Sequence, residues 1–234
     1  MKTRHKNSER LVTKVFEDVF DKYDLMNDLM SFGIHRIWKN NFINWLNPQK
    51  DTILLDVASG TGDIAKLYFK KINYKGSVYC VDENKNMLQL NKEKFQKNKN
   101  VKWFCNAAEK LPFKNNYFDY YTISFGIRNV SDIDKTLKEA YRVLKPGGRF
   151  LCLEFSKVKN ETLNRIYKTY SKSIPKIGKF VMGKSTPYEY LINSIEKFYS
   201  QEEFFKLIKK QNFNNISFRN LSGGIVAIHS AWKV

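Results

Sequence analysis

A short glycine-containing turn at residues 58–63 constrains the fold of this chain more than any other feature of its sequence. The mostly apolar residues 53–57 run directly into this turn, as a buried parallel strand does when it leads into a tight loop and a helix. Gly60 and Gly62 carry no Cβ, so the backbone can approach a ligand closely and adopt a positive φ there. We therefore predict a nucleotide-binding turn, in which Thr61 adds a hydroxyl donor.

A second apolar run, residues 77–81, supports this interpretation because it ends in Asp82, twenty residues beyond Gly62 (82 − 62). A carboxylate at the tip of that strand can accept hydrogen bonds from both hydroxyls of a ribose. The alternative is a plain glycine turn followed by an unrelated aspartate, which the agreement of the two strands disfavours.

The turn lacks the third glycine of the dinucleotide fingerprint, and this argues against a pyrophosphate bound at the helix N-terminus. Asp63 opens the predicted helix, and its negative charge would repel phosphate and suit a cation. S-adenosylmethionine is a nucleoside that carries a sulfonium and an ammonium group. These residues therefore favour S-adenosylmethionine over NAD as the cofactor.

The chain has 234 residues, which suits one α/β domain with a full-sized core. No run of 18 or more apolar residues is present, which predicts no membrane span. The N-terminus is basic but leads into no apolar segment, so we expect a cytoplasmic protein without a secretion signal. Cys80, Cys105 and Cys152 fall in predicted strands and are expected to be reduced core thiols.

The formal net charge of +18 favours attraction to anionic membrane surfaces. A nucleic-acid site is disfavoured, because 33 of the 41 basic residues are lysines, only eight are arginines, and the lysines are spread over predicted surface helices. Such a lysine bias can also arise from genome composition rather than from a binding surface. We therefore expect peripheral contact with the inner membrane face and no nucleic-acid partner.

Strands and helices alternate after the glycine turn, and this alternation predicts crossover connections in a parallel sheet. Helices are predicted at residues 63–72, at 84–96, and after Ser131, which has a capping-box partner in Asp134. The strands predicted beyond the first two are residues 101–105, 117–124, 149–155, 214–221 and 224–232.

The last two strands are joined only by Ser222 and Gly223, so we predict an antiparallel hairpin that follows a helix at 201–211 and closes the sheet. The fold class is therefore α/β, with a mostly parallel seven-stranded sheet. We divide this single domain into a helical cap (1–48), a cofactor-binding core (49–155), a lid or substrate region (156–200) and a closing helix with the hairpin (201–234).

The predicted cap contains an amphipathic helix that begins at Ser8 and a second helix at 35–46, and we expect both to lie over the ligand cleft. The predicted lid interleaves apolar and aromatic residues with lysines between 156 and 190. This pattern suits a lid or a surface that rests on lipid headgroups, and it equally suits a helix packed on the body with its lysines outward.

Small and polar residues follow the third predicted strand, at the edge of the sheet where an α/β protein binds its ligand. Ala107 and Ala108 would let backbone amides reach the adenine edge, while Asn106 or Glu109 could contact the adenine amino group. A plain loop would have much the same sequence.

The fourth predicted strand ends near Ser124, Arg128 and Asn129, so these residues are candidates for the chemistry. Arg128 could instead be a surface ion-pair partner. The chain uses lysine almost everywhere else, and an arginine between Ile127 and Asn129 beside the cleft therefore favours a functional role.

The chain resembles the class I methyltransferases, which have a Rossmann-like fold, and more narrowly the UbiE/MenG-type quinone-biosynthesis C-methyltransferases. The resemblance runs from about residue 15 to the C-terminus. Its most specific segments are KYDLMNDLMSFGIHRIWK (22–39), LLDVASGTGD (54–63), ISFGIRNV (123–130), RVLKPGGRFLCLEFSK (142–157) and GGIVAIHSAWK (223–233). The resemblance implies methyl transfer from S-adenosylmethionine to a ring carbon of a polyprenylated quinol, either 2-methoxy-6-polyprenyl-1,4-benzoquinol or demethylmenaquinol.

The resemblance also implies that Thr61, Asp82, the Ala107–Ala108 pair and Ser124 bind the cofactor. One position departs from the family pattern, which has Asn or Asp followed by Ala where Ala107 and Ala108 stand. Asn106 comes one place earlier. Either Asn106 makes the adenine contact through a shifted loop, or that contact is made by the backbone alone.

Methyl transfer to carbon is an in-line displacement that needs no metal, but the ring hydroxyl must lose its proton so that the adjacent carbon becomes nucleophilic. A guanidinium stays protonated, so Arg128 is a poor base. We predict that Arg128 and Asn129 hold the phenolate or an activating water. Asp24, His35 and Glu154 are rival candidates for the base.

Two other classes of protein compete with this interpretation. A nucleic-acid methyltransferase that acts on amino groups commonly has an Asn/Asp-Pro-Pro-aromatic motif, and Ser124-Phe125-Gly126 stands there instead. A non-catalytic binding module could keep the fold without the chemistry. The sequence also leaves open the ring, the tail length, and whether the enzyme acts alone, as a homodimer or in a quinone-biosynthesis complex.

Overall fold

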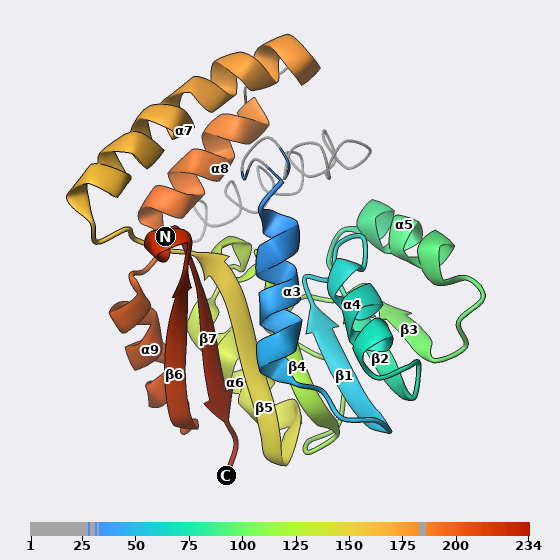
Figure 1. Cartoon of the computed structure of the whole chain (residues 1–234). Coiled ribbons are helices and arrows are strands. Elements are labelled where there is room, and N and C mark those ends of the chain that lie inside the picture. Colours follow the sequence, from blue (N-terminus) through green and yellow to red (C-terminus); the bar gives the residue numbers. More distant parts are fainter. Residues whose placement is uncertain (1–27, 29–30, 32, 183–185) are drawn as a thin grey trace.

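The computed structural model describes residues 28, 31, 33–182 and 186–234 (Figure 1). The helix predicted from Ser8, most of the predicted cap and the candidate base Asp24 therefore lie outside the described residues. The first half of the described chain contains α3 (His35–Leu46), β1 (Thr52–Val57), α4 (Asp63–Lys71), β2 (Gly76–Val81), α5 (Lys85–Phe95), β3 (Val101–Phe104), β4 (Phe118–Ser124) and the 3₁₀ helix η2 (Ile127–Asn129). The second half contains α6 (Ile133–Val143), β5 (Leu144–Phe155), α7 (Glu161–Met182), α8 (Thr186–Lys197), α9 (Gln201–Lys210), β6 (Asn214–Leu221), η3 (Ser222–Gly224) and β7 (Val226–Trp232).

The described strands form one seven-stranded sheet in the order β3-β2-β1-β4-β5-β7-β6. The pairs among β1 to β5 are parallel, and β7 runs antiparallel to both β5 and β6. The predicted α/β fold class, with its C-terminal hairpin, is thereby confirmed. Because the order reverses at β1 and β4, a crevice opens between the carboxyl ends of these two strands.

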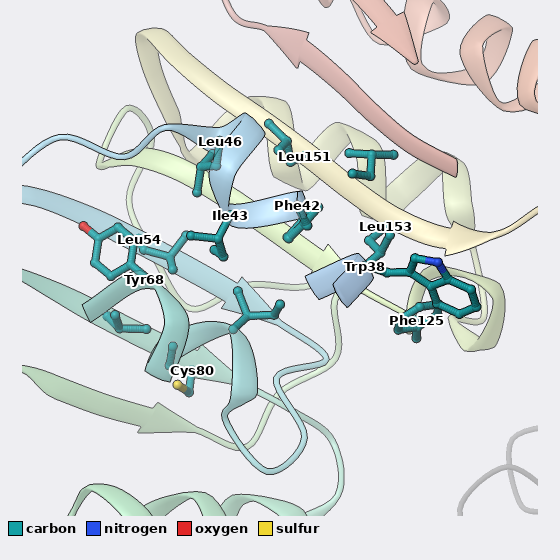
Figure 2. Close-up of a cluster of buried hydrophobic side chains, with 14 of the residues drawn as sticks. Trp38, Phe42, Ile43, Leu46, Leu54, Tyr68, Cys80, Phe125, Leu151 and Leu153 are labelled. Carbon is teal, nitrogen blue, oxygen red and sulfur yellow. The ribbon is translucent and has the colours of Figure 1, made fainter. Parts of the chain in front are cut away.

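Successive side chains of each strand enter opposite cores, as the two-residue period of a strand requires. Leu54 packs with α3 and α4, whereas its neighbour Leu55 packs with residues of α6 on the other face. Figure 2 shows the first of these cores, in which Trp38, Phe42 and Leu46 of α3 point toward the sheet. The result is a sheet between two helical layers, with the α7–α8 pair beyond the carboxyl end of β5 (Figure 1).

Arg149 on β5 fixes the end of α3 to the sheet. Its buried guanidinium donates from Nη1 to the carbonyls of Trp45 and Leu46 at 2.6 and 3.1 Å, and from Nε to the Ser230 hydroxyl at 2.9 Å. These carbonyls are C-terminal groups of a helix, which attract a cation. This contact sets the position of α3 along the sheet.

Two local predictions are wrong. The cap of α6 is Asp132 rather than Ser131, because the Asp132 carboxylate accepts the Lys135 amide at 3.0 Å. Aspartate caps a helix as well as serine does, and Glu109 accepts the Asp132 amide at 3.0 Å, which replaces the return contact of a capping box. Cys105 is exposed because β3 ends at Phe104, whereas the other two cysteines are buried as predicted.

The last predicted strand before the lid begins earlier than expected. The sequence predicts a strand at 149–155, but β5 begins at Leu144. The register with β4 shifts between Phe118 and Tyr120, which accommodates the extra residues. In the lid region, two long helices occupy 161–182 and 186–197, and Pro175 lies inside the first.

A buried histidine predicts a loss of stability in acid. His229 lies between the rings of Phe204 and Phe218, with Nε2 2.9 Å from the Gln201 carbonyl. Burial lowers the pKa of His229 to about 4, against the opposing effect of that carbonyl. An unfolded histidine has a pKa near ~6.5, so below this pH the unfolded chain binds a proton that the folded chain does not.

Stability is therefore lost as the pH falls from about 6.5 toward 4, and about 2 kcal/mol of this loss is expected between pH 7 and pH 5. Denaturant unfolding of the wild type and of His229→Gln, which keeps a donor for the carbonyl, measures this effect. The difference in the free energy of unfolding between the two proteins should narrow as the pH falls. A constant difference would show that His229 does not titrate as predicted.

Candidate active site

A pocket opens at the carboxyl ends of β1, β2 and β4. The pocket is lined by Val57, Ala58, Gly60, Asp82, Glu83, Asn84, Met87, Asn106, Ala108, Glu109, Ser124, Phe125, Gly126, Asn129 and Val130. It therefore lies where the topology of the sheet reverses.

The glycine turn forms one wall of the pocket, and Gly60 and Gly62 have different structural roles in it. Gly60 has a φ of +50° and lines the pocket, and a Cβ built on it would meet nothing within 4 Å. Gly62 has a φ of +86°, and its Cβ would lie 2.8 Å from both Asn91 and Phe95. Gly60 thus leaves space for a ligand, whereas Gly62 lets α5 pack closely against the turn.

Asp82 lies at the tip of β2 and is held by two backbone amides. Its Oδ2 accepts from Gly60 at 2.8 Å and its Oδ1 accepts from Asn84 at 2.9 Å. Burial raises the pKa of Asp82, and the two amides counteract this effect. The carboxylate is therefore fixed in orientation at the pocket wall, and binding of a ribose by Asp82 stays a prediction.

Two polar atoms at the pocket wall are buried without a hydrogen-bond partner in the described part of the chain: Ser124 Oγ and Asn84 Nδ2. The Asn84 carbonyl oxygen is already used, since it accepts the amides of Asn86 and Met87 and so caps α5. Buried polar groups are normally paired, so a ligand with several hydrogen-bonding groups would complete this wall. A ribose beside Asp82 and a purine between apolar walls fit the residues present.

The tip of β4 forms the wall next to the first strand. Phe125 has a φ of +56°, an uncommon conformation for a residue with a bulky side chain. A Cβ on Gly126 would overlap the Cβ of Ala58, so the loops after β1 and β4 are in direct contact. Phe125 also packs on Trp38 of α3 (Figure 2), with ring centroids 6.2 Å apart.

Arg128 and Glu154 form a buried ion pair behind this wall. Arg128 Nη1 donates to Glu154 Oε1 at 2.8 Å and to the Phe125 carbonyl at 2.6 Å, and its Nε donates to Ser194 Oγ at 3.3 Å. Their side chains are only 6% and 2% exposed, which excludes the alternative of a surface ion pair. Burial raises the pKa of Glu154, against the opposing effect of Arg128.

A sequence model of the ubiE/COQ5 methyltransferase family matches residues 2–233. The chain belongs to this family. It is 54% identical over 243 aligned positions to the ubiquinone/menaquinone biosynthesis C-methyltransferase UbiE of Rickettsia bellii (strain OSU 85-389), an alignment that covers 100% of this chain and 96% of the relative. The enzyme of the same name from Brucella suis biovar 1 is 49% identical, with 96% of this chain and 86% of the relative covered.

Solved structures place the ubiE/COQ5 chain in the same fold class. A SAM-dependent methyltransferase of Thermotoga maritima, described as a possible histamine N-methyltransferase, has a TM-score of 0.67 at 19% identity, with 95% of this chain and 100% of that chain covered. Phosphoethanolamine N-methyltransferase 2 of Haemonchus contortus, solved with S-adenosyl-L-methionine, has a TM-score of 0.61 at 18% identity, with 84% of this chain and 52% of that chain covered. The predicted resemblance is confirmed, and the protein is an S-adenosylmethionine-dependent methyltransferase.

The structure of this ubiE/COQ5 methyltransferase places the predicted cofactor residues in two groups. Gly60, Asp82, Asn106, Ala108 and Ser124 line the pocket. Thr61, Gly62 and Ala107 are not among the described residues that line it, and Thr61 is only 6% exposed. Asn106 comes one place before the position of the family's Asn or Asp, and it lies at the pocket wall. This location is what the first alternative requires, in which Asn106 contacts the adenine through a shifted loop. The role of each residue in binding stays a prediction.

Sequence reasoning missed two polar residues at the pocket wall, Glu83 and Asn84. Asn84 had a detectable signal, because an asparagine directly before a helical segment is a common N-cap. Glu83 follows directly after Asp82, so its position at the strand tip was available as a signal as well.

Asp63 does not provide the uncompensated negative charge that the sequence predicted at the start of α4. Burial would raise the pKa of Asp63, but Lys39 at 2.7 Å and Lys94 at 3.8 Å lower it overall. The two lysines offset the negative charge at the start of α4, so this carboxylate does not by itself select a cation. The choice of S-adenosylmethionine depends instead on the pocket and on the family.

His35 and Asn129 are the remaining residues that the sequence predicted for the catalytic site. His35 is buried beside Asp28, with Nε2 2.9 Å from Asp28 Oδ1, and it is not among the described residues that line the pocket. Burial lowers the pKa of His35, against the opposing effect of Asp28. Asn129 lines the pocket directly, and its Oδ1 accepts the Tyr190 hydroxyl at 3.0 Å.

Proposed function

We propose that this protein transfers the methyl group of S-adenosylmethionine to a ring carbon of a polyprenylated quinol in ubiquinone or menaquinone biosynthesis. The observation that carries the proposal is the relationship over nearly the full length to enzymes of that name, at 49 to 54% identity. The buried Arg128–Glu154 pair behind the cofactor pocket is consistent with it.

The bound cofactor supplies an electrophilic methyl group on a sulfonium. The chain must hold that group, exclude water, and stabilise the negative charge of the phenolate. We assign Asp82 to the ribose hydroxyls and Asn106 and Ala108 to the adenine, because all three residues line the pocket. Glu154 is less suited to be the base, because its Oε1 already accepts from the Arg128 side chain and the Phe155 amide, and its Oε2 accepts the Arg128 amide at 3.5 Å.

Arg128 and Asn129 then orient the phenolate or a water that takes the proton from the quinol hydroxyl. The positive charge of Arg128 favours the phenolate over the phenol. Tyr190 donates to Asn129 Oδ1 at 3.0 Å, so the donor end of the Asn129 amide is available to an oxygen of the substrate. Tyr190 is therefore a positioning residue for Asn129.

Replacing Tyr190 with Phe should lower kcat about tenfold and leave the affinity for S-adenosylmethionine unchanged, because the change frees the Asn129 side chain to rotate. Tyr199→Phe is the matched control, since that hydroxyl is on an exposed residue away from Asn129. Steady-state kinetics with Tyr190→Phe, Asn129→Ala and the double variant give the decisive measurement. Fully additive effects on kcat would contradict the proposed coupling between the two residues.

The proposed function itself is tested by an assay with defined acceptors. The purified protein is incubated with S-adenosylmethionine and with a benzoquinol or a naphthoquinol, and the methylated ring is identified by mass spectrometry. Methylation at a ring carbon of either acceptor supports the proposal. Transfer to oxygen or nitrogen only, or to neither quinol under reducing conditions, would overturn it.

We also propose that the α7–α8 region rests on an anionic membrane surface. Exposed residues of α7 include Arg165, Lys168 and Lys179, together with Ile166, which is 62% exposed. None of the helices in the described residues is long and apolar enough to span a bilayer. Basic and apolar groups on one surface helix suit contact with lipid headgroups.

The variant Arg165→Glu/Lys179→Glu should co-sediment with vesicles of phosphatidylglycerol several-fold less than the wild type. Lys92→Glu/Lys97→Glu makes the same change of charge at two exposed lysines, on α5 and in the turn that follows it, and should have little effect. Binding of the wild type should also weaken as salt is added. Equal binding to neutral and anionic vesicles would count against the membrane surface.

A further inference from the structure

A second cavity, of about 500 Å³, lies below α7 and α8 and is separate from the cofactor pocket. It is lined by Ser156, Lys157, Val158, Asn164, Tyr167, Lys168, Ser171, Ile192, Ile195 and Glu196. None of these residues lines the first pocket, so the function described so far leaves this cavity unassigned.

The Arg128–Glu154 pair lies between the two spaces. Phe125 lines the cofactor pocket, and its carbonyl accepts from the Arg128 guanidinium. On the other side, Arg128 Cζ lies 5.6 Å from the centroid of the Phe155 ring, and the next residue along the chain, Ser156, lines the cavity. A quinol ring held by Arg128 would therefore have the cofactor on one side and this cavity on the other.

The lining of the cavity suits a hydrocarbon chain that enters from a charged surface. Val158, Ile192, Ile195 and the ring of Tyr167 supply apolar surface, and Ile195 is 8% exposed. Burial raises the pKa of Tyr167 to about 12, so this side chain is neutral and adds no charge. The charged members of the lining, Lys157, Lys168 and Glu196, are exposed residues, and their aliphatic stems can cover an apolar ligand while the charges stay in water.

We infer that this cavity receives the isoprenoid units of the quinol tail nearest the ring, and that it makes the enzyme selective for tailed acceptors. The inference rests on the proposed function. It is favoured over a site for a small polar ligand because Val158 and Ile195 are buried in the lining, whereas the charged members of the lining are exposed. The cavity also lies below the exposed basic face of α7, from which a membrane-soluble substrate would enter.

The test fills the cavity and compares two acceptors that differ only in the tail. Ile192→Trp adds bulk from α8, and the matched control Asn193→Trp makes an equally large change at the adjacent exposed residue. The wild type should methylate a quinol with several isoprene units with a higher kcat/KM than a tail-free quinol. Ile192→Trp should reduce this preference about tenfold or more by lowering kcat/KM for the tailed acceptor alone.

Asn164→Phe fills the same cavity from α7 and should give the same result, so the inference can be tested even if Ile192→Trp fails to fold. Equal losses for both acceptors, or an unchanged preference in both cavity variants, would overturn the inference. These results differ from failure of the proposed function, in which the wild type would methylate neither acceptor.

Discussion

Gly126→Ala should reduce the affinity for S-adenosylmethionine at least tenfold. A Cβ at residue 126 would lie well inside the 3.0 Å that real Cβ atoms keep from a neighbour, and that neighbour is the Cβ of Ala58. Both residues line the cofactor pocket, on the loops after β1 and β4. A Cβ cannot rotate away, so the two loops must separate, and the pocket loses its shape.

The expected loss of affinity in Gly126→Ala comes from steric overlap with Ala58 and not from backbone strain at residue 126. Gly126 has a φ of −116°, which any residue adopts, whereas Ala58 has a φ of +50°, which favours glycine. The double variant Gly126→Ala/Ala58→Gly removes the overlap and relieves the unfavourable φ at residue 58. We therefore expect it to recover most of the lost affinity.

Calorimetric titration with S-adenosylmethionine measures the affinity, and thermal unfolding reports the stability. Gly147→Ala is the matched control, because its φ of +77° makes alanine unfavourable while no atom lies within 4 Å of the added Cβ. It should lower stability by about 1 kcal/mol without changing the affinity. An unchanged affinity in Gly126→Ala, or no recovery in the double variant, would refute contact between the loops as the cause.

The sequence correctly predicted those pocket residues whose location follows from the direction of the strands alone. Every parallel strand delivers its last residue to the same edge of the sheet, so Gly60, Asp82, Asn106 and Ser124 could be assigned to one pocket without knowing any distance. The short predicted link likewise indicated the antiparallel strands β6 and β7, although β7 begins at Val226 rather than at residue 224, and the link, residues 222–225, contains the 3₁₀ helix η3.

The sequence could not predict contacts between residues that are far apart in the chain. Asp63 looked like an uncompensated charge at a helix start, because its partner Lys39 lies in a different helix, 24 residues earlier. Arg128 looked available for a substrate, and its pairing with Glu154 depends on the neighbouring positions of β4 and β5. Such contacts depend on which elements pack together, and no local pattern encodes that.

The sequence also did not show where each strand ends, and this made the prediction for Cys105 wrong. Cys105 continues the apolar run of β3 in sequence, yet β3 ends one residue earlier and leaves the thiol exposed near the Glu83 carbonyl, at 3.5 Å. Composition does not mark the end of a strand, because the last residue is decided by hydrogen bonds to its neighbour, here β2.

Arg128→Ala should lower kcat by about 10²- to 10³-fold and change the dissociation constant of S-adenosylmethionine by about threefold or less. Arg128 is not among the described residues that line the cofactor pocket, so its loss leaves the cofactor contacts in place. What it removes is a guanidinium held beside the tip of β4 by the Phe125 carbonyl, where the phenolate is expected.

The variant has a second effect that must be separated from the first. Glu154 would be left buried, 2% exposed and without its partner, and an unpaired buried charge costs about 3–5 kcal/mol of stability. Arg128→Ala/Glu154→Gln removes that charge as well. This double variant should recover most of the stability measured by denaturant unfolding, while its kcat stays as low as in Arg128→Ala.

Arg128→Lys distinguishes charge from geometry. Lysine keeps the positive charge but cannot donate in the planar arrangement that joins Glu154, Phe125 and Ser194, so partial recovery of kcat is expected. Equal losses of kcat and cofactor affinity in Arg128→Ala would contradict a role in holding the phenolate. Recovery of kcat in the Glu154→Gln double variant would contradict it as well, since Arg128 would then serve only to neutralise a buried carboxylate.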